Sequence, residues 1–350
     1  MKKLFALLLT IAMVLSVTAC GGKSAPTSSG GSDAGTTPSA PDGAKKVTVG
    51  LIQLTEHPSL DEIREAVTSR LAEKAAENGL DIQVNYQNGQ GDTSTINTIC
   101  QQFVANQVDV IVAIATPAAQ GAAAAAENSG IPVVFSAVTD PVAAGLVASI
   151  EAPGGSITGT SDAIPVEKIF SLAQELTPDV KSYGLIYNTS EDNSLSVIAQ
   201  VKDYLEGKSI PYTEGAVTTS ADVQSSARNL LERCDAVFAP IDNTVASAMA
   251  VLADEAIKAK KPVYVAADSM VADGGLATVG VNYTNLGSQT ADMVLKVLTG
   301  TPAGEIPVEI LRDNAIVING NTARAIGVDR SMGLLDAIQR VGQVLGPLCT

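Results

Sequence analysis

The fold of this chain is decided by one segment, Asp109-Val110-Ile111-Val112-Ala113-Ile114-Ala115-Thr116-Pro117. Its apolar run is almost continuous, which is typical of a central strand in a parallel sheet that is covered on both faces. Thr116 and Pro117 then suit the start of a helix, because threonine caps helices and proline is favoured in their first turn. A buried strand that leads directly into a helix predicts an α/β domain.

The same alternation of strand and helix continues on both sides of this segment and then starts again. In the first set, strands are expected at residues 47–52, 82–86, 108–115 and 132–136. In the second set, strands are expected at residues 183–187, 235–239 and 261–265. Ser59 and Glu62 have the spacing of a capping box at the start of the first helix. We therefore predict an α/β fold of two doubly wound, Rossmann-like lobes.

The C-terminal part of the chain, from Asn285, has too few elements for a core of its own. After Asn285 a helix is followed by two short apolar runs, at residues 308–311 and 315–318. We expect these elements to return to the two lobes, so that the chain crosses between them several times and forms a hinge. Lobe one is then 46–162 plus about 284–311, lobe two is 163–283 plus about 312–330, and 331–350 is an unexplained tail.

The N-terminus has the composition of a targeting signal. Lys2 and Lys3 precede an apolar run that ends in Val17-Thr18-Ala19-Cys20, so residues 1–19 are predicted to be a signal peptide. A plain secretory signal and a bacterial lipobox both fit this pattern, and the lipobox interpretation makes Cys20 the lipidated residue. Residues 20–45 are rich in Gly, Ser and Pro and suit a flexible tether. The folded part is therefore expected outside the cytoplasm, anchored by lipid to the bacterial cell membrane.

Composition argues against several classes of function. The 350 residues carry a formal net charge of −15, which argues against nucleic acid as a partner because phosphates need a basic surface. One His and four Cys offer little material for a metal site. No nucleophile elbow or phosphate-binding loop is present, and Cys100 and Cys234 are expected to be core thiols. We therefore predict no catalytic residues, no metal and no cofactor; an extracytoplasmic α/β enzyme is the more distant alternative.

Ligands of doubly wound sheets bind beyond the carboxyl ends of the strands. Polar side chains occupy these positions in both lobes. The candidates are His57, Thr116, Ser136, Thr139 and Asp140 in lobe one, and Asn188, Asp242, Asn243 and Asp268 in lobe two. Simpler roles exist for some of them: Thr116 and Asp140 could each cap the helix that they begin, Asp268 could be a turn residue, and His57 a surface or packing residue.

Several segments of the chain carry a resemblance to a known family. They are 49–53 (VGLIQ), 57–60 (HPSL), 109–120 (DVIVAIATPAAQ), 131–141 (IPVVFSAVTDP), 159–162 (GTSD) and 274–280 (GGLATVG). Together with the lipobox and the two lobes, they resemble the substrate-binding lipoproteins of bacterial ABC importers, which have the type I periplasmic-binding-protein fold. More narrowly, the chain is similar to the family that includes tryptophan/tyrosine-binding lipoproteins. The resemblance spans about residues 46–330.

This resemblance implies a receptor that captures a small solute between two lobes and delivers it to the permease and ATPase of an ABC importer. An amino acid, possibly an aromatic one, is the implied solute; a sugar, a nucleoside or a signal molecule is the alternative. By loop position, the solute's carboxylate is assigned to Thr116, Ser136 and Thr139, and its ammonium group to Asp268. His57, Thr160, Asn188, Asp242 and Asn243 complete the expected binding residues, with Tyr283, which could instead belong to the hinge.

Overall fold

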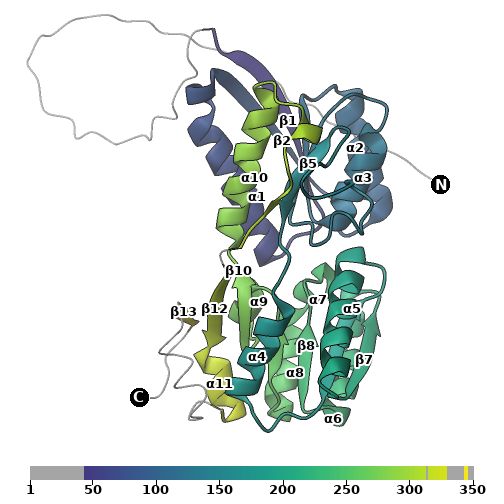
Figure 1. The fold of residues 1–350 in the computed structure, drawn as a ribbon, viewed down its shortest axis with the longest axis vertical. Coiled ribbons are helices and arrows are strands. Elements are labelled where there is room, and N and C mark those ends of the chain that lie inside the picture. Colours follow the sequence, from purple (N-terminus) through teal and green to yellow (C-terminus); the bar gives the residue numbers. More distant parts are fainter. Residues whose placement is uncertain (1–42, 313, 329–342, 346–350) are drawn as a thin grey trace, which may run out of the picture. The chain divides into compact units, whose positions relative to one another are not determined.

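The first lobe is built on a parallel sheet with the strand order β11-β5-β4-β3-β1-β2 (Figure 1). The computed structural model describes residues 43–312, 314–328 and 343–345. The strands are β1 (Lys45–Gln53), β2 (Leu80–Asn88), β3 (Val110–Ile114), β4 (Val133–Ser136), β5 (Ile157–Ser161) and β11 (Glu309–Ile310). All five residues of β3 are buried, as expected for a central strand with neighbours on both sides.

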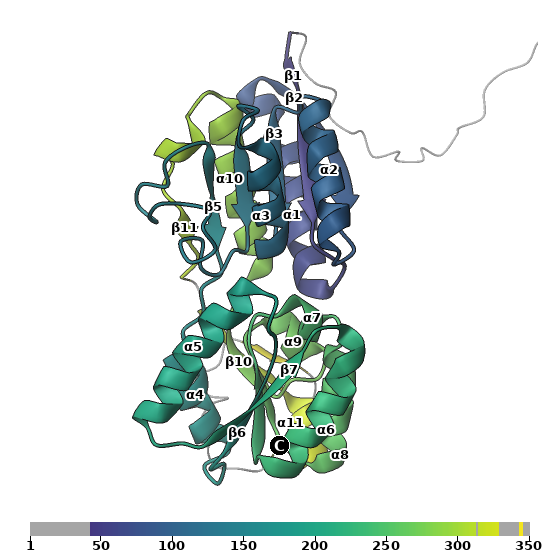
Figure 2. The same cartoon turned by 90° about the vertical axis from the view of Figure 1, so that its right-hand side faces the viewer.

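Helices cover both faces of this sheet. The helices are α1 (Pro58–Lys74), α2 (Thr93–Ala105), α3 (Thr116–Ala126) and α10 (Tyr283–Leu298), with short 3-10 turns η1 (Ala76–Asn78) and η3 (Ala303–Glu305). Helices α1 and α10 lie together on one face, and α2 and α3 on the other (Figure 2). The α1–α10 contact is close because Gly287 has no side chain: a Cβ there would lie 2.6 Å from the Ile63 carbonyl oxygen. This contact fixes the start of α1 relative to the start of α10.

The second lobe has a sheet with the strand order β13-β12-β10-β9-β8-β6-β7, in which β12 runs antiparallel to β10. The strands are β6 (Tyr183–Asn188), β7 (Tyr212–Val217), β8 (Ala236–Ala239), β9 (Val263–Val265), β10 (Ala277–Val281), β12 (Asn314–Asn319) and β13 (Gln343–Leu345). The helices are α4 (Val166–Leu176), α5 (Asp192–Gly207), α6 (Val223–Arg233), α7 (Asn243–Ala246), α8 (Met249–Ala259), α9 (Asp268–Ala272) and α11 (Gly320–Ile326), with a 3-10 turn η2 (Ser220–Asp222).

Strand β6 shows how alternation builds the core of this lobe. Leu185 faces the cluster formed with α4 and α5, whereas Ile186 faces the opposite cluster, which includes residues of α6 and α8. Phe170 of α4 anchors the first cluster, with its ring centroid 5.0 Å from that of Tyr183 and 5.2 Å from that of Phe238. The predicted fold class, two doubly wound α/β lobes, is confirmed.

The chain passes between the two sheets at three places. It leaves lobe one after β5 and enters lobe two at α4, returns between β10 and α10, and crosses again between β11 and β12. Asp162 lies at the first crossing and Tyr283 at the second. All the described residues belong to one compact unit.

The structure corrects three expected helix starts. Helix α1 begins at Pro58 with His57 as its N-cap, so Ser59 lies inside the helix and the predicted capping box is wrong. Ala115, not Thr116, is the N-cap of α3, because Ala115 adopts φ 80° and the helix begins one residue earlier. Asp140 begins a turn instead of a helix, and its Oδ1 accepts a hydrogen bond from the Ala143 amide at 2.9 Å.

Candidate functional site

A small cavity, here called the inner chamber, lies where loops of the two lobes meet. Its walls are His57, Ser59, Leu60, Ala137, Asp162, Asn193, Ile241, Asp242, Asn243, Ala246, Ala267, Met270 and Tyr283. The space among them is about 340 Å3, but only a water-sized part of it is clear of van der Waals contact with the walls. A solute as large as an amino acid therefore needs the walls to move apart slightly.

The chamber is built from the carboxyl ends of the strands, as the fold rule requires. In lobe one, the segment after β1 brings His57 and the first turn of α1 brings Ser59 and Leu60. The end of β4 brings Ala137, and the end of β5 brings Asp162. Ala137 adopts φ 56°, an uncommon backbone conformation for a residue with a side chain. Such strained residues are concentrated at functional sites, and this one forms part of the chamber wall.

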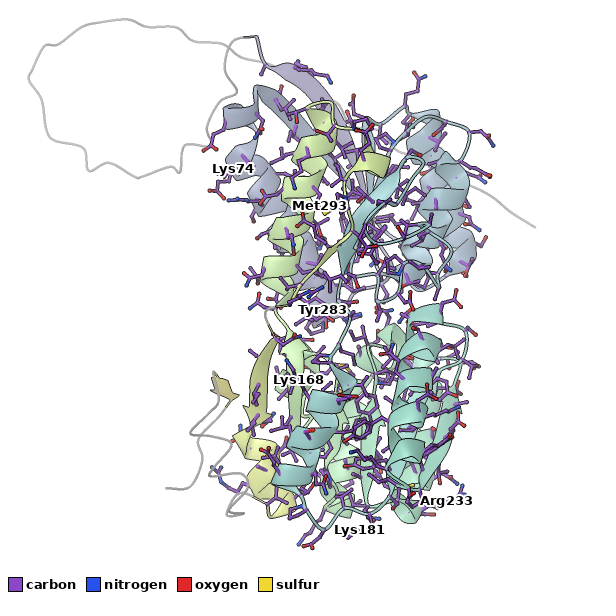
Figure 3. All side chains as sticks on the ribbon, in the orientation of Figure 1. Lys74, Lys168, Lys181, Arg233, Tyr283 and Met293 are labelled. Carbon is purple, nitrogen blue, oxygen red and sulfur yellow. The ribbon has the colours of Figure 1, made fainter. Side chains whose placement is uncertain are left out.

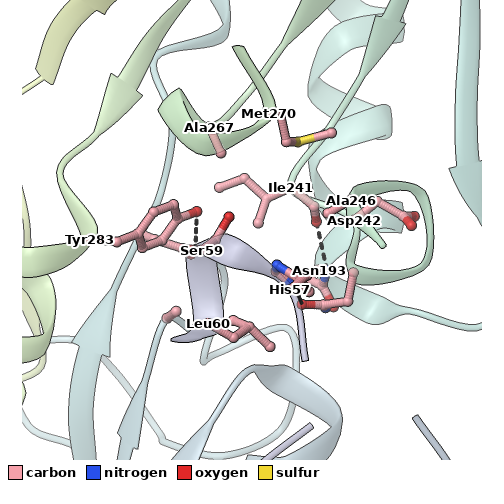
Figure 4. A pocket seen from close by; sticks show the side chains of 13 residues that line it. His57, Ser59, Leu60, Asn193, Ile241, Asp242, Ala246, Ala267, Met270 and Tyr283 are labelled. Atoms are coloured by element: carbon pink, nitrogen blue, oxygen red, sulfur yellow. Dashed lines mark hydrogen bonds between the residues drawn. The ribbon is translucent and has the colours of Figure 1, made fainter. Parts of the chain in front are cut away.

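One half of the chamber is apolar and the other half is rich in hydrogen-bond acceptors. Ile241, Ala246, Ala267 and Met270 of lobe two and Leu60 of lobe one supply the apolar part (Figure 4). Neither Lys nor Arg is among the described residues that line it. The labelled basic residues Lys74, Lys181 and Arg233 lie far from Tyr283, which is at the junction of the lobes (Figure 3).

Asp162 is a fully buried carboxylate in the chamber wall. Its Oδ1 accepts a hydrogen bond from Thr139 Oγ1 at 2.9 Å, and its Oδ2 accepts one from the Tyr283 hydroxyl at 3.3 Å. Burial raises the pKa of Asp162 to about 6, because neutral hydroxyl groups do not replace the hydration of a charge. The hydrogen bond between Asp162 and Tyr283 also joins two of the three crossings, so this part of the wall belongs to the hinge.

A second buried carboxylate, Glu191, organises the opposite side of the chamber. Its Oε2 accepts hydrogen bonds from Asn243 Nδ2 at 2.6 Å and from Asn193 Nδ2 at 3.2 Å, and its Oε1 accepts from Thr244 Oγ1 at 2.9 Å. Asn243 Oδ1 is 3.2 Å from His57 Nε2 in the other lobe. Burial lowers the pKa of His57, which favours the neutral imidazole.

Asp242 lines the chamber but acts mainly as a helix cap. Its carboxylate accepts hydrogen bonds from the amides of Asn188 at 2.6 Å and Val245 at 2.8 Å, and from Ser194 Oγ at 2.7 Å. Burial and the neighbouring Glu191 raise the pKa of Asp242 well above that of an ordinary carboxyl group. Its hydrogen bonds hold the loops that carry Asn193 and Asn243.

The amino end of α1 points toward the chamber and has free donors. The His57 side chain makes no capping hydrogen bond, and the first backbone bond of the helix runs from Asp61 N to His57 O. The amides of Ser59 and Leu60 thus remain for a ligand, as the first amides of any helix do. Ser59 Oγ is hydrogen-bonded to Ser269 Oγ of lobe two.

Contacts between the lobes show that the cleft is closed. Besides the bonds of His57 and Ser59, Gln120 Nε2 donates to Asp192 Oδ2 at 2.7 Å, and Ser196 Oγ donates to Asp140 Oδ2 at 2.9 Å. Each of these bonds joins one side chain of lobe one to one of lobe two. Opening the cleft would break all four.

The structure brings four of the predicted binding residues into the chamber wall: His57, Asp242, Asn243 and Tyr283. Thr139 lies directly behind the wall, where it binds Asp162. Asn188 is one layer further away, at the end of β6, where its amide donates to Asp242 Oδ2. Tyr283, for which a hinge role was the alternative, lies both at a crossing and in the wall.

The other predicted residues lie outside the wall. Ser136 and Thr160 are buried in lobe one, where their hydroxyls bind Thr290 of α10 at 2.7 and 2.8 Å. Thr116 is buried, and its hydroxyl has no hydrogen-bond partner. Asp268 is the first residue of α9 and is half-buried, instead of lying in an exposed loop. Burial raises the pKa of Asp268 to about 6. Their roles in binding stay predictions.

Three polar wall residues were not predicted as binding residues: Ser59, which was expected only to cap α1, Asp162 and Asn193. Asp162 follows β5, a strand that has no long apolar run and was therefore not expected. Asn193 was assigned to the loop after β6, but nothing in its neighbourhood distinguished it from five other polar residues of that loop. Asp162 directly follows β5, whereas Ser59 and Asn193 lie in the first turns of the helices that follow β1 and β6. The general rule was right, and the list of expected strands was incomplete.

Among the described residues, no cluster of three or more His, Cys, Asp or Glu could hold a metal ion. Within that same part of the chain, the helices are too short or too polar to cross a bilayer.

Comparison with known proteins places this fold and chamber in context. A family model described as "ABC transporter substrate binding protein" matches residues 48–341. A curated tyrosine-binding protein of Clostridioides difficile is 36% identical over 300 residues, which is 86% of each chain. A leucine-binding protein from Thermotoga maritima has the same fold, with a TM-score of 0.56 at 11% identity over 72% of this chain and 82% of that chain.

Two solved structures of similar sequence identity differ in how well they match. An ABC domain from Streptococcus pneumoniae in complex with L-Trp has a TM-score of 0.80 at 36% identity, covering 86% of this chain and 100% of that chain. A ligand-free, open substrate-binding protein from Clostridium difficile has a TM-score of 0.65 at 34% identity, with the same coverage. The better match to the complex agrees with the four contacts that join the lobes here.

Proposed function

Because the chain belongs to the family of ABC transporter substrate-binding proteins, we propose that it captures an aromatic amino acid between its lobes and delivers it to the permease of an ABC importer. Members of this family bind solutes and are not enzymes. The observation that carries the proposal is the inner chamber itself, which combines an apolar wall with a buried, cation-free carboxylate.

The chamber offers complementary groups for the two charges of an amino acid. Asp162 would receive the ammonium group, because a buried carboxylate without a cationic partner is stabilised most by a charge-assisted hydrogen bond. The free amides at the start of α1 would receive the carboxylate, since the amino end of a helix favours anions. Asp268, the residue expected from loop position, is the second candidate for the ammonium group.

The remaining wall is apolar and is suited to a solute with a large apolar side chain. Met270 and Ile241 are large apolar residues of this wall. The methionine side chain is flexible, and its sulfur makes favourable contacts with aromatic rings. The similarity to a tyrosine-binding protein and to an ABC domain in complex with L-Trp supports the same class of solute. Sugars, nucleosides and signal molecules are the alternatives that a binding experiment has to exclude.

Isothermal titration of the purified protein is expected to show tight binding of L-tryptophan or L-tyrosine. Small aliphatic and cationic amino acids are expected to bind at least about tenfold more weakly, because one buried side chain of aromatic size contributes on the order of 1.5–3 kcal/mol. A panel of sugars and nucleosides serves as the control. Binding of a sugar or nucleoside, with no heat from any amino acid, would overturn the proposed class of solute.

We further propose that Cys20 carries the lipid that holds the protein on the outer face of the cell membrane. This cysteine lies outside the described residues, and the proposal rests on the lipobox pattern. Replacement Cys20→Ala is expected to move the protein from the membrane fraction to the medium or periplasm of its host, because a stable anchor is lost. The matched variant Cys100→Ala should stay in the membrane fraction. Unchanged membrane association of Cys20→Ala would show that the anchor lies elsewhere.

A further inference from the structure

Two buried acceptor atoms in the inner chamber have no partner. They are Nδ1 of His57 and Oδ1 of Asn193. His57 is 7% exposed to solvent and Asn193 is 3% exposed. Buried polar atoms are almost always hydrogen-bonded, so each unpartnered atom that faces a binding chamber indicates a group that the ligand supplies.

The orientation of Asn193 follows from its neighbours. Its Nδ2 donates to the Ile241 carbonyl oxygen at 2.7 Å and approaches Glu191 Oε2 at 3.2 Å. Both partners can only accept hydrogen bonds, since a carbonyl and a carboxylate have no donor. The amide nitrogen is therefore fixed on that side, and the oxygen is the atom left without a partner.

The tautomer of His57 follows from the same carboxylate. Asn243 Nδ2 donates to Glu191 Oε2, which leaves Asn243 Oδ1 as an acceptor toward His57 Nε2. His57 must then carry its proton on Nε2, so Nδ1 of the neutral ring is an acceptor. Glu191 thus determines that both unpartnered atoms accept hydrogen bonds.

These two acceptors lie apart from the proposed ammonium site. Figure 4 shows His57 and Asn193 close together and Tyr283, the partner of Asp162, on the other side of Ser59. An amino acid whose ammonium group meets Asp162 would extend its side chain across the chamber. The far end of that side chain would then reach the acceptors.

We propose that His57 Nδ1 and Asn193 Oδ1 receive the ring N–H or O–H of the solute's side chain, so that the protein selects tryptophan and tyrosine over phenylalanine. This inference rests on the proposed function and specifies how its site distinguishes among aromatic side chains. Apolar contacts alone discriminate weakly between ligands of similar shape. A ligand that lacks the donor leaves the buried acceptor unpaired and therefore binds much more weakly. Glu191 is the positioning residue of this arrangement.

The test compares pairs of amino acids that differ in one ring donor. L-Tryptophan is compared with L-3-benzothienylalanine, in which sulfur replaces the ring N–H, and L-tyrosine with L-phenylalanine, by isothermal titration of the full chain in mild detergent. We expect the donor-bearing member of at least one pair to bind about 10- to 100-fold more tightly, the range for leaving a buried acceptor unpaired. Because this arm uses the unaltered protein, it does not depend on the folding of a variant.

Variants then assign the effect to residues. Asn193→Leu and His57→Phe each remove one acceptor at similar volume, and Asn229→Leu, an exposed position on α6, is the control. We expect the affinity ratio to fall toward 1 in at least one of the two chamber variants and to persist in the control. Ratios near 1 in the unaltered protein, or ratios that neither chamber variant changes, would overturn this inference while leaving aromatic amino-acid binding intact. Failure of every amino acid to bind would instead reject the proposed function.

Discussion

Without a solute, the Asp162→Asn variant is expected to close at pH 7.5, whereas the unaltered protein stays open. In the closed structure Asp162 is fully buried and its pKa is about 6, against an ordinary value of 3.8. Excluding the remaining water from the ionised carboxylate therefore opposes closing, by at most about 3 kcal/mol at 1.36 kcal/mol for each pKa unit. Asparagine fills the same space and carries no charge, so this barrier to closing disappears.

The pH dependence has a definite sign. A carboxyl group whose pKa is raised in the closed form opposes closing while it is ionised, so the full effect is present above about pH 6. As the pH falls toward 3.8 the group becomes protonated in the closed form, and the opposition to closing disappears. The unaltered, solute-free protein should therefore become more compact between pH 7.5 and pH 5. The pKa of Asp268 is raised in the same way in the unaltered protein and in Asp162→Asn. The difference in compaction between these two proteins therefore reports on Asp162.

Small-angle scattering at pH 7.5 and pH 5 measures this closing directly. The solute-free Asp162→Asn protein should have the smaller radius of gyration at pH 7.5, and its value should change less with pH. The exposed substitution Asp203→Asn on α5 is the control and should behave as the unaltered protein. Identical radii of Asp162→Asn and unaltered protein at pH 7.5 would show that Asp162 does not govern closing.

The second large effect is expected from Glu191→Ala, which should lower the free energy of unfolding by about 2–4 kcal/mol. The carboxylate accepts hydrogen bonds from both the amide and the side chain of Asn243, and from both the amide and the hydroxyl of Thr244. Alanine leaves these donors without partners where water has little access. Removing this charge also relieves its repulsion with Asp242, which offsets part of the loss.

Urea denaturation provides the measurement, and Glu232→Ala provides a matched control. Glu232 is exposed on α6, so its truncation should change the free energy of unfolding by no more than about 0.5 kcal/mol. The Glu191 variant should also lose affinity for the solute, since Asn243 and Asn193 are no longer held in place. A stability within experimental error of the control would mean that the network around Glu191 rearranges without loss.

Much of the fold was predictable because parallel sheets concentrate apolar residues. The strands β1, β3, β4, β6, β8 and β9 were each expected from a short apolar run. The return of the C-terminal elements was also expected: α10 and β11 complete lobe one, and β12 adds to the sheet of lobe two. In contrast, β5 has the sequence Ile-Thr-Gly-Thr-Ser, which contains no apolar run. It forms a strand because it pairs with β4 in the folded sheet, and that contact cannot be read from the local sequence.

The sequence predicted which loops form the site, but it was less successful in predicting which side chains of those loops line it. The strand-end rule selected His57, Asp242 and Asn243, which line the chamber, because position along the chain determines which loops reach the cleft. It could not determine which way a side chain points: Ser136, at the end of β4, turns toward Thr290 in the interior of lobe one. Asp162 was missed because the strand before it was missed.

The central claim, capture of an aromatic amino acid between the lobes, is tested most directly by the solute that the protein carries from its host. Native mass spectrometry of protein purified without denaturation, followed by release and fragmentation of the bound molecule, identifies that solute. We expect L-tryptophan or L-tyrosine at one molecule per chain. A sugar, a nucleoside or a solute without a primary amine in that place would contradict it.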